Sequence, residues 1–317
     1  MGRVHFFLIF FLFLSLPNSS LSSFSYNCFS DQSLALLYFR NYFSVGYSND
    51  FCDEYSYPPR NSWKMGIDCC WWDGVTCDTM TGHVIVVDLS CSGLVGPIHP
   101  NTTLFSLWHL QWLNLAYNYF NHPTISSKFG GFANMMHLNL SDSSIVGNFP
   151  SEISHLSKLV SLDLSFNFGL RIEMPCLKRL VQNLTHLSEL VLDYVNMSSI
   201  SPNSFMNLSS SLTSLRLFGL SGFDLKGRFP DNIFHLPNLQ LLYVGSDSNL
   251  TSSLPRYNWS TPLKSLDLSK TGFPIDLPNL TSNLKSLKKL HLHGCNFIGS
   301  YPTFLPSLTQ ITSLDLS

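Results

Sequence analysis

The sequence of 317 residues predicts an α/β solenoid, a chain of stacked coils. Three observations indicate this fold: an apolar motif returns at a near-constant interval, a short apolar run opens the chain, and cysteines gather before the first copy of the motif. The motif is clearest at 159–167, LVSLDLSFN, with the spacing LxxLxLxxN. A motif of this spacing that returns about every 20 to 29 residues is typical of leucine-rich repeats.

Ten copies of the motif follow one another from residue 84 to residue 317. Their first apolar anchors are Val84, Leu110, Met135, Leu159, Leu187, Leu212, Leu239, Leu263, Leu287 and Ile311. The intervals between them are 26, 25, 24, 28, 25, 27, 24, 24 and 24 residues. A single LxxLxL arises by chance in an apolar chain, but ten regular copies do not. The period therefore predicts a leucine-rich-repeat superhelix with a parallel concave β-sheet.

Alternation along a short strand assigns the side chains of each copy to two faces. Positions 1, 4 and 6, which are Leu159, Leu162 and Leu164 in the clearest copy, should enter the core. Positions 3, 5, 7 and 8 should face outward on the concave side. Position 9 is Asn118 or Asn167 in two copies, where the amide can hydrogen-bond the turning backbone. Stacked coils would thus present a long, rigid and variable binding face.

The first residues are typical of a secretory signal. Arg3 and His5 precede an apolar run from Phe6 to Leu16, and a serine-rich stretch follows. The run is too short for a membrane span and stands at the terminus, so we expect residues 1–25 to be a signal peptide. The mature chain would then enter an oxidising, extracellular compartment.

Six of the eight cysteines lie before residue 92, which predicts a disulfide-linked N-terminal cap over residues 26–83. A solenoid needs a cap because its first leucine row would otherwise meet water. Asp31 is placed to N-cap a helix with Leu34, Leu37 and Tyr38 at helical spacing. Residues 41–61 predict an aromatic loop. The paired CxxC knuckles of a zinc site are absent.

The string CCWWDGVTC at 69–77 resembles the CCxWxGVxC cap of plant extracellular leucine-rich-repeat proteins. The segments at 145–150, 225–230 and 297–302 resemble the LxGxIP signature of the same proteins. One branch is similar in three further features: DQSLALL near the start, a long loop containing Cys52, and VDLSCS in the first repeat. That branch is the plant receptor-like proteins of the disease-resistance type, and the resemblance covers the whole chain.

This resemblance implies an ectodomain that recognises an extracellular protein or peptide ligand, derived from a pathogen or from the plant. Such proteins carry further repeats, one membrane span and a short cytoplasmic tail, and signal through partner receptor kinases. The chain stops at residues 314–317, LDLS, inside a repeat strand. We therefore expect the N-terminal portion of an ectodomain with a truncated last repeat, joined to the membrane only through a span that these residues lack.

The resemblance also implies how the cysteines pair. It predicts one disulfide between Cys28 and Cys69 and another between Cys70 and Cys77. Cys52 and Cys91 remain for a third bridge, and their pairing stays open. The last two cysteines, Cys176 and Cys295, would be free thiols within the repeats.

Eight N-glycosylation sequons follow the signal, at Asn101, Asn139, Asn183, Asn196, Asn207, Asn249, Asn258 and Asn279. Three of them, Asn183, Asn207 and Asn279, precede an anchor leucine and should lie off the concave sheet. Asn139 differs because it occupies position 5 of its strand, so a glycan there would cover part of the concave face.

The concave positions are the candidate ligand-binding site. The aspartates at position 5 recur in the LDLS string and should serve the scaffold; they are Asp88, Asp163, Asp267 and Asp315. The less regular occupants are candidate contacts: Trp112, Tyr117, Phe166, Tyr194, Arg216, Phe218, Tyr243, His291 and His293. Aromatic residues and arginine are enriched at interface anchors, although isolated exposed aromatic residues also occur without a partner.

Other function classes find little support in the sequence. No nucleophile elbow, HExxH helix or phosphate-binding loop is present, which argues against an enzyme. His291 and His293 share a strand face without evident further ligands, so no metal or cofactor is predicted. A formal charge of −2 and the absence of a basic cluster argue against nucleic acid.

Two alternatives to a receptor ectodomain stay open. A secreted inhibitor of cell-wall-degrading enzymes is one, since polygalacturonase-inhibiting proteins share the paired-cysteine cap and have about ten repeats. Against it, those proteins lack the long loop around Cys52 and end in a second cysteine cap. The other alternative is a truncated gene product without function. The transcript beyond Ser317 would separate these interpretations.

Overall fold

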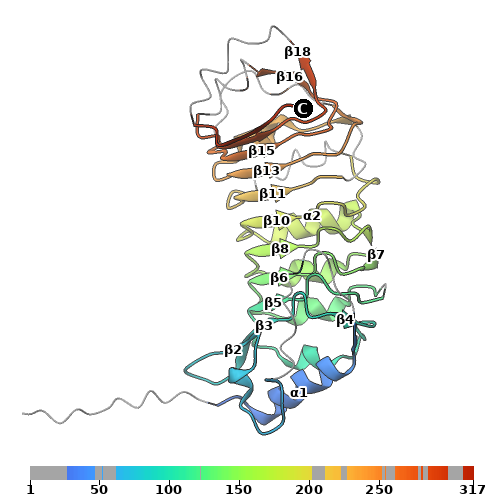
Figure 1. Ribbon diagram of the computed structural model, residues 1–317, viewed down its shortest axis with the longest axis vertical. Helices are drawn as coiled ribbons and strands as arrows, with labels where there is room; N and C mark the ends of the chain where they lie inside the picture. The colour runs from blue at the N-terminus through green and yellow to red at the C-terminus, as the bar shows by residue number, and fades with distance from the viewer. Residues whose placement is uncertain are drawn as a thin grey trace, which may run out of the picture.

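The computed structural model describes residues 27–46, 52, 62–121, 123–201, 211–222, 227–251, 254, 261–277, 280, 285–298 and 310–317. The predicted signal peptide and most of the predicted cap loop lie outside these residues. The described chain winds into a curved stack of coils, with α1 (Ser30–Asn41) at one end and the C-terminus at the other (Figure 1). No helix among the described residues is both long enough and apolar enough to cross a bilayer.

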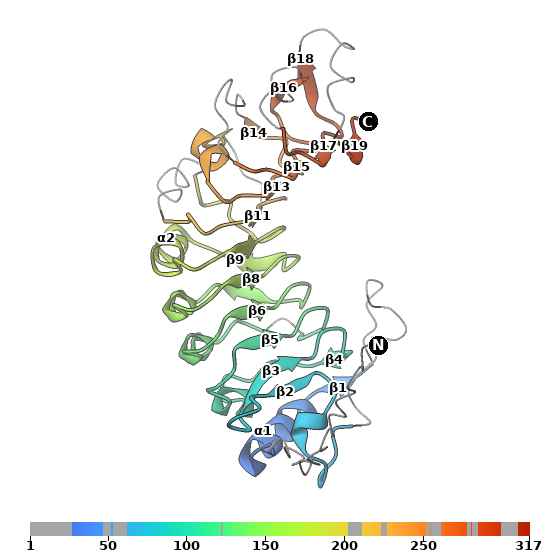
Figure 2. The same cartoon turned by 90° about the vertical axis from the view of Figure 1, so that its left-hand side faces the viewer.

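Each coil contributes one strand to a single concave sheet, which faces the viewer in Figure 2. In the described chain this sheet has eleven strands: β2 (Val75–Cys77), β3 (Val84–Asp88), β5 (Trp112–Asn114), β6 (His137–Asn139), β8 (Ser161–Asp163), β10 (Glu189–Val191), β11 (Leu217–Gly219), β13 (Leu241–Tyr243), β15 (Ser265–Asp267), β17 (Lys289–His291) and β19 (Ser313–Asp315). All neighbours pair in parallel except β2 and β3, which are antiparallel. The predicted solenoid with its parallel concave sheet is confirmed.

Short ribbons and helical turns close the other sides of the coils. The ribbons pair β1 (Ser44–Val45) with β4 (Leu94–Val95), β7 (Val146–Asn148) with β9 (Gly169–Arg171), β12 (Gly227–Arg228) with β14 (Leu250–Thr251), and β16 (Pro274–Asp276) with β18 (Asn296–Ile298). The helical elements are α2 (Met174–Asn183) and the 3-10 turns η1 (Cys69–Trp71), η2 (Thr103–Ser106), η3 (Ser127–Gly131), η4 (Ser151–His155) and η6 (Asp231–His235).

Helix α1 covers the first coil by satisfying its open backbone edge. The buried Gln32 accepts a hydrogen bond from the Val84 N–H at 2.7 Å, and its amide nitrogen lies 2.7 Å from His83 Nδ1. Thr103 donates to the Ala35 carbonyl from η2. The cap therefore ends the solenoid with hydrogen bonds as well as with apolar contact, as an exposed first coil requires.

The buried face of the helix overlaps the predicted one only at Leu37, which is buried. Leu34 and Tyr38 are exposed, whereas Ala35, Leu36 and Phe39 are buried. The predicted N-cap is also wrong, because the helix begins at Ser30 and the Asp31 carboxylate accepts instead from the neighbouring Gln32 N–H. A short helix rich in apolar residues offers two stripes at helical spacing, and only the coil beneath selects one.

The leucine rows form the core as predicted. Leu159, Leu162 and Leu164 are fully buried, and the corresponding anchors of the other coils stack against them in one cluster. In several coils position 7 contradicts its prediction, because residues such as Ala116 and Ser165 are buried rather than outward-facing. Here the chain already bends off the strand, so alternation no longer applies, and most coils carry a small side chain at this position.

The sixth coil starts three residues later than predicted. The sequence offers two overlapping frames, beginning at Leu212 and at Leu215. Pairing of β10 and β13 with β11 fixes the second frame by placing Phe218 beside Leu190 and Leu242, both anchors at position 4. Phe218, predicted to be an outward contact, is therefore a fully buried core residue. The interval from Leu187 to the corrected first anchor, Leu215, is therefore 28 residues.

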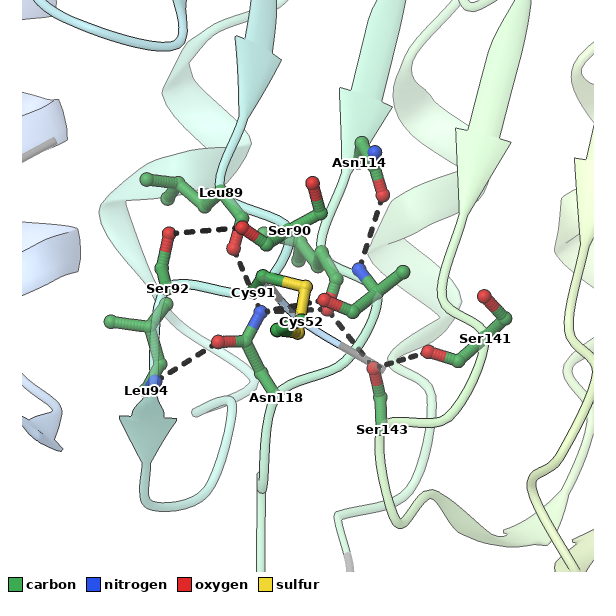
Figure 3. The surroundings of a disulfide bond; sticks show 12 residues. Cys52, Leu89, Ser90, Cys91, Ser92, Leu94, Asn114, Asn118, Ser141 and Ser143 are labelled. Atoms are coloured by element: carbon green, nitrogen blue, oxygen red, sulfur yellow. Dashed lines mark hydrogen bonds between the residues drawn. A yellow bond between two sulfur atoms is a disulfide. The ribbon is translucent and has the colours of Figure 1, made fainter. Parts of the chain in front are cut away.

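The two position-9 asparagines form buried bridges between coils. Asn167 donates to the carbonyls of Leu140, Leu164 and Ser165, and its Oδ1 accepts from Ser143 and Ile145 N–H groups. Asn118 repeats this arrangement one coil pair earlier, linking Leu89 to Leu94 (Figure 3). Both predicted backbone roles are confirmed.

Three disulfides hold the cap in the described residues. Cys28 is bonded to Cys69 and Cys70 to Cys77, the two pairings implied by the resemblance. The third bond joins Cys52 to Cys91 and settles the open pairing. Figure 3 shows this bond next to the Asn118 amide. The Cys52–Cys91 disulfide ties the predicted cap loop to the first repeat. Residues 44–45 of that loop form β1 rather than the irregular chain that was predicted. Cys176 and Cys295 are free.

Candidate functional site

Position 8 of successive coils forms a column along one edge of the concave sheet. Nine coils place a residue with positive φ there: Cys91, Tyr117, Asp142, Phe166, Tyr194, Gly222, Ser246, Lys270 and Gly294. In each case the position-8 N–H donates to the position-7 carbonyl of the next coil, as Tyr117 does to Ser141 and Phe166 to Asp193. The left-handed turn thus keeps the sheet hydrogen-bonded while the chain bends away, and the side chain stands at the rim of the concave face.

Two aromatic residues of this column, Phe166 and Tyr194, cluster with Phe168, which lies two residues beyond position 8. We call these three residues the aromatic ledge. The rings of Phe166 and Tyr194 stack at 5.1 Å, and Phe168 lies 5.7 Å from Tyr194. Phe166 is 43% exposed and Phe168 70% exposed. Such exposed, stacked rings offer apolar area to a partner at a small cost in side-chain entropy.

The absence of a side chain at Gly222 leaves room for the Tyr194 ring. A Cβ at Gly222 would overlap the ring, and the residue has a φ of +72° that other residues adopt only with strain. With this space open, the Tyr194 hydroxyl reaches two coils along and donates to Ser246 Oγ at 3.4 Å. The aromatic ledge is therefore held from behind by the sixth and seventh coils.

A second aromatic pair lies on the strands themselves. Trp112 and His137 occupy position 3 of adjacent strands in register, and their rings are 4.2 Å apart. Trp112 is 39% exposed. Burial lowers the pKa of His137, while nearby Glu189 opposes that shift. The pair therefore presents a neutral aromatic surface across the sheet from the aromatic ledge.

Half-buried carboxylates lie between these aromatic groups. Burial raises the pKa of Asp163, and Glu189 adds to the rise. Burial likewise raises the pKa of Tyr117, with Asp163 and Asp142 contributing. Because the negative charges of Asp142, Asp163 and Glu189 act on one another in a partly desolvated place, these carboxylates favour a cation nearby.

All four predicted position-5 aspartates serve the scaffold. Asp88, Asp163, Asp267 and Asp315 each accept a hydrogen bond from the position-7 N–H of the same coil. The sixth coil has Gly219 at this position and cannot do so. Asp193, at position 7 of the fifth coil, supplies the missing acceptor and receives the Ser221 N–H at 2.6 Å.

Asp193 makes the stability of the fold depend on pH. Burial raises the pKa of Asp193 from its ordinary 3.8 to about 6, against hydrogen bonds from Ser221 that lower it. The Asp193 carboxyl therefore binds its proton more tightly in the folded chain than in the unfolded chain. The cost of ionising the carboxyl is fully present above pH 6 and is relieved as the pH falls from about 6 to 4. We expect a gain in the free energy of unfolding on the order of 2 to 3 kcal/mol over that range.

Thermal unfolding measured from pH 4 to 7.5 tests this expectation. Asp193→Asn should be more stable than the parent at pH 7.5 and should show a flatter dependence on pH, since its amide stays neutral. Asp193→Ala should lose stability at pH 4, where the parent carboxyl is neutral, because the Ser221 N–H loses its acceptor, and it should be less stable than Asp193→Asn at every pH. Parallel curves for Asp193→Asn and the parent would contradict the assignment.

The other predicted contacts are spread along the face. Tyr243 lies half-buried at position 5 of β13, and Arg216 is exposed at position 2 of the sixth coil rather than at position 5. His291 lies 3.3 Å from Ser313 Oγ, and His293 lies 2.7 Å from Ser317 Oγ, so each pairs with the next coil. The structure does not bring these four residues to the aromatic ledge.

Two residues of the site were missed by the sequence interpretation. Phe168 follows the position-9 asparagine, outside the positions assigned to the concave face. Asp193 stands at position 7, where every other coil except the ninth, which has His293, carries a small residue; this is a signal that the sequence does contain. The four sulfurs of Cys28, Cys69, Cys70 and Cys77 lie within 4.8 Å of one another, but as two disulfides they offer no thiolate to a metal.

Comparison with known proteins identifies the family. No family model matches the chain. Receptor-like protein 6 of Arabidopsis thaliana is 42% identical over 279 residues, which cover 84% of this chain. Receptor-like protein Cf-9 of Solanum pimpinellifolium is 42% identical over 276 residues, also 84% of this chain. The chain belongs to the plant receptor-like proteins. It spans 28% and 31% of the length of these two relatives.

Solved structures support the same architecture for this receptor-like protein. The structure of PEPR1–AtPEP1 is 26% identical with a TM-score of 0.61, and covers 90% of this chain and 41% of that chain. The plant peptide hormone receptor RGFR1 in complex with RGF2 is 23% identical with a TM-score of 0.56, covering 78% of this chain and 49% of that one. The second likeness concerns the fold alone. The predicted membership of the receptor-like proteins and the predicted fold are both confirmed.

Proposed function

We propose that the concave face binds an extracellular protein or peptide that presents an apolar or aromatic side chain next to a basic group. The observation that carries this proposal is the aromatic ledge beside half-buried carboxylates, above all Asp163. Exposed aromatic residues in a preformed setting are the usual anchors of an interface. Negatively charged carboxylates in a concave surface attract a positively charged group of a partner.

We further propose the role of the whole protein from its relatives. The parent protein would perceive a pathogen-derived or self-derived ligand outside the cell and signal through co-receptor kinases, without catalysis and without a cofactor or nucleic acid. Residues 1–25 would direct secretion, residues 26–83 would cap the solenoid, and residues 84–317 would form the recognising repeats. A span beyond these repeats would hold the protein at the extracellular side of the plasma membrane.

Glycans belong to the same proposal. Asn101, Asn183 and Asn249 are exposed, and Asn183 ends α2 on a side away from the concave sheet. Asn196 and Asn139 are half-buried, with Asn139 in β6 on the concave face. Asn207, Asn258 and Asn279 lie outside the described residues. A sugar on Asn139 would leave the aromatic ledge open and restrict access to the strands beside Trp112.

Alanine substitution tests the concave-face proposal. Peptides selected from a displayed random library against the chain should carry aromatic residues next to lysine or arginine. Phe166→Ala, Tyr194→Ala or Trp112→Ala should weaken binding of a selected peptide by about 2 kcal/mol or more, roughly thirtyfold. Binding is measured by calorimetry or surface plasmon resonance, and melting is measured in parallel.

The exposed Lys288, which lies at position 2 of a distant coil, is the matched control. Lys288→Ala should cost less than about 1 kcal/mol of binding. The concave assignment is wrong if all three aromatic variants bind normally while changes within residues 41–61 abolish binding.

A further inference from the structure

A cavity of about 240 Å³ opens where two neighbouring coils leave their short ribbon. β7 and β9 end side by side there, with Asn148 paired to Arg171 in register. After β7 the chain turns into η4 at Ser151, and after β9 it turns into α2 at Met174. The cavity thus lies off the concave sheet, between the starts of two helical elements.

Two arginines line this cavity, Arg171 from the end of β9 and Arg179 from the second turn of α2. Arg179 donates one long hydrogen bond of 3.4 Å to Ser151 Oγ. Within the part of the chain that the structure describes, neither arginine forms an ion pair; the recorded pairs lie at Asp231 and Asp267. A guanidinium has five N–H donors in a planar fork that matches a carboxylate. Most of these donors are therefore available to an anion.

The remaining lining groups indicate the kind of anion. Glu173 brings a negative charge to the same cavity, so two arginines and one glutamate leave a net charge of +1. A net charge of +1 matches a ligand with one negative charge better than it matches phosphate, which carries more than one. Asn148 and Ser151 supply neutral hydrogen-bonding groups, and the exposed Pro175 supplies an apolar surface. A ligand that carries one carboxylate, several hydroxyls and an apolar face would use all of these groups.

The free cysteine in the wall has a structural role. Cys176 is buried, and its Sγ donates to the Phe149 carbonyl at 3.5 Å. Burial raises the pKa of this thiol to about 11, so it stays protonated at neutral pH and is a poor nucleophile. Phe149 is in turn tied to β9, because its N–H donates to the Arg171 carbonyl at 2.8 Å. The wall is thus preformed, and binding there would be reversible.

We propose that this cavity is a binding site for one monocarboxylated sugar residue. The carboxylate lies on Arg171 and Arg179, hydroxyls donate to Glu173, and the ring rests on Pro175. The volume is below the range of about 300 to 1,000 Å³ that takes drug-sized ligands, which fits one sugar ring rather than an oligomer. This site is separate from the concave face and does not depend on its proposed ligand.

Saturation-transfer NMR on the full chain tests the site. Glucuronate and glucose are the observed probes, and inorganic sulfate, which has no protons to observe, is followed by its competition with glucuronate. Glucuronate should receive saturation and glucose should not. The double variant Arg171→Gln/Arg179→Gln should weaken glucuronate binding at least about tenfold, since two charge-assisted contacts are lost. Glu173→Gln should weaken glucuronate and strengthen sulfate, because the carboxylate repels a dianion but accepts from sugar hydroxyls.

Arg228→Gln is the matched control, because Arg228 ends another short ribbon and is paired with Asp231 at 2.9 Å. It should leave glucuronate binding unchanged, and equal melting temperatures should show that all variants fold. Absence of saturation transfer to glucuronate would overturn the site. Equal binding of glucose, or sulfate binding that ignores Glu173→Gln, would overturn its assignment to an acidic sugar.

Discussion

Replacing Asn167 with alanine is expected to lower the free energy of unfolding by about 3 to 5 kcal/mol. The side chain is fully buried and makes five hydrogen bonds to the backbone of two coils. Alanine would leave the Ser143 and Ile145 N–H groups without an acceptor, and would remove the donor shared by three carbonyls. Each buried group left unsatisfied costs about 1 to 3 kcal/mol. Urea unfolding followed by circular dichroism measures the loss.

Two further variants separate this role from simple loss of a side chain. Asn167→Asp should be at least as harmful, because a carboxylate oxygen would then face the three carbonyls that the amide now serves. Asn114→Ala is the matched control, since Asn114 is half-buried and makes a single 3.2 Å bond to the Ala116 N–H. It should cost about 1 kcal/mol. Similar losses of unfolding free energy for Asn114→Ala and Asn167→Ala would refute the claim that the Asn167 bridge contributes more to stability than an ordinary side-chain hydrogen bond.

Removal of the Cys52–Cys91 disulfide is expected to cost about 4 kcal/mol of stability, and removal of Cys70–Cys77 about 2. The difference follows from loop length, because the first bond joins residues 39 apart and the second joins residues 7 apart. A longer crosslinked loop removes more conformational entropy from the unfolded chain. Paired serine variants and denaturant unfolding provide the measurement.

Peptide mapping without reduction must accompany that comparison. It should recover Cys52 with Cys91, Cys28 with Cys69 and Cys70 with Cys77. A Cys69–Cys77 crosslink would contradict the pairing, and equal losses for the two serine pairs would contradict the entropic account. Cys176→Ser, which removes a free thiol, should leave the crosslinks intact.

The sequence predicted the regular part of the fold because the regular part is repetitive. A leucine row is buried only by its neighbours, so the period itself encodes the stacking, and Leu159, Leu162 and Leu164 lie where it places them. The disulfide pairing was not encoded in this way, since six cysteines allow 15 connectivities. It was available only through the resemblance carried by the paired cysteines, and even that left Cys52 and Cys91 open.

The errors lie where one coil departs from its neighbours. In the sequence alone, the repeat motif fits the sixth coil equally well when it begins at Leu212 or at Leu215. Only hydrogen bonding to β10 and β13 rejects the first alignment, which would expose Phe218. Asp193 acts on the next coil, so its role depends on the absence of a side chain at Gly219, 26 residues later. The aromatic ledge was found in part, through Phe166 and Tyr194. Phe168 lies beyond the turn, where strand alternation gives no guidance.

The left-handed column at position 8 limits how the concave face can diversify in sequence. Its side chains stand at the rim of the concave face, yet a positive φ strongly disfavours residues branched at Cβ. The nine occupants include cysteine, tyrosine, phenylalanine, aspartate, serine, lysine and glycine, and none is valine, isoleucine or threonine. New specificities at this rim would therefore draw on a restricted alphabet of aromatic, charged and small residues. A library designed to retarget the face should vary the column within that alphabet and reserve β-branched residues for positions 3 and 5, where the backbone is extended.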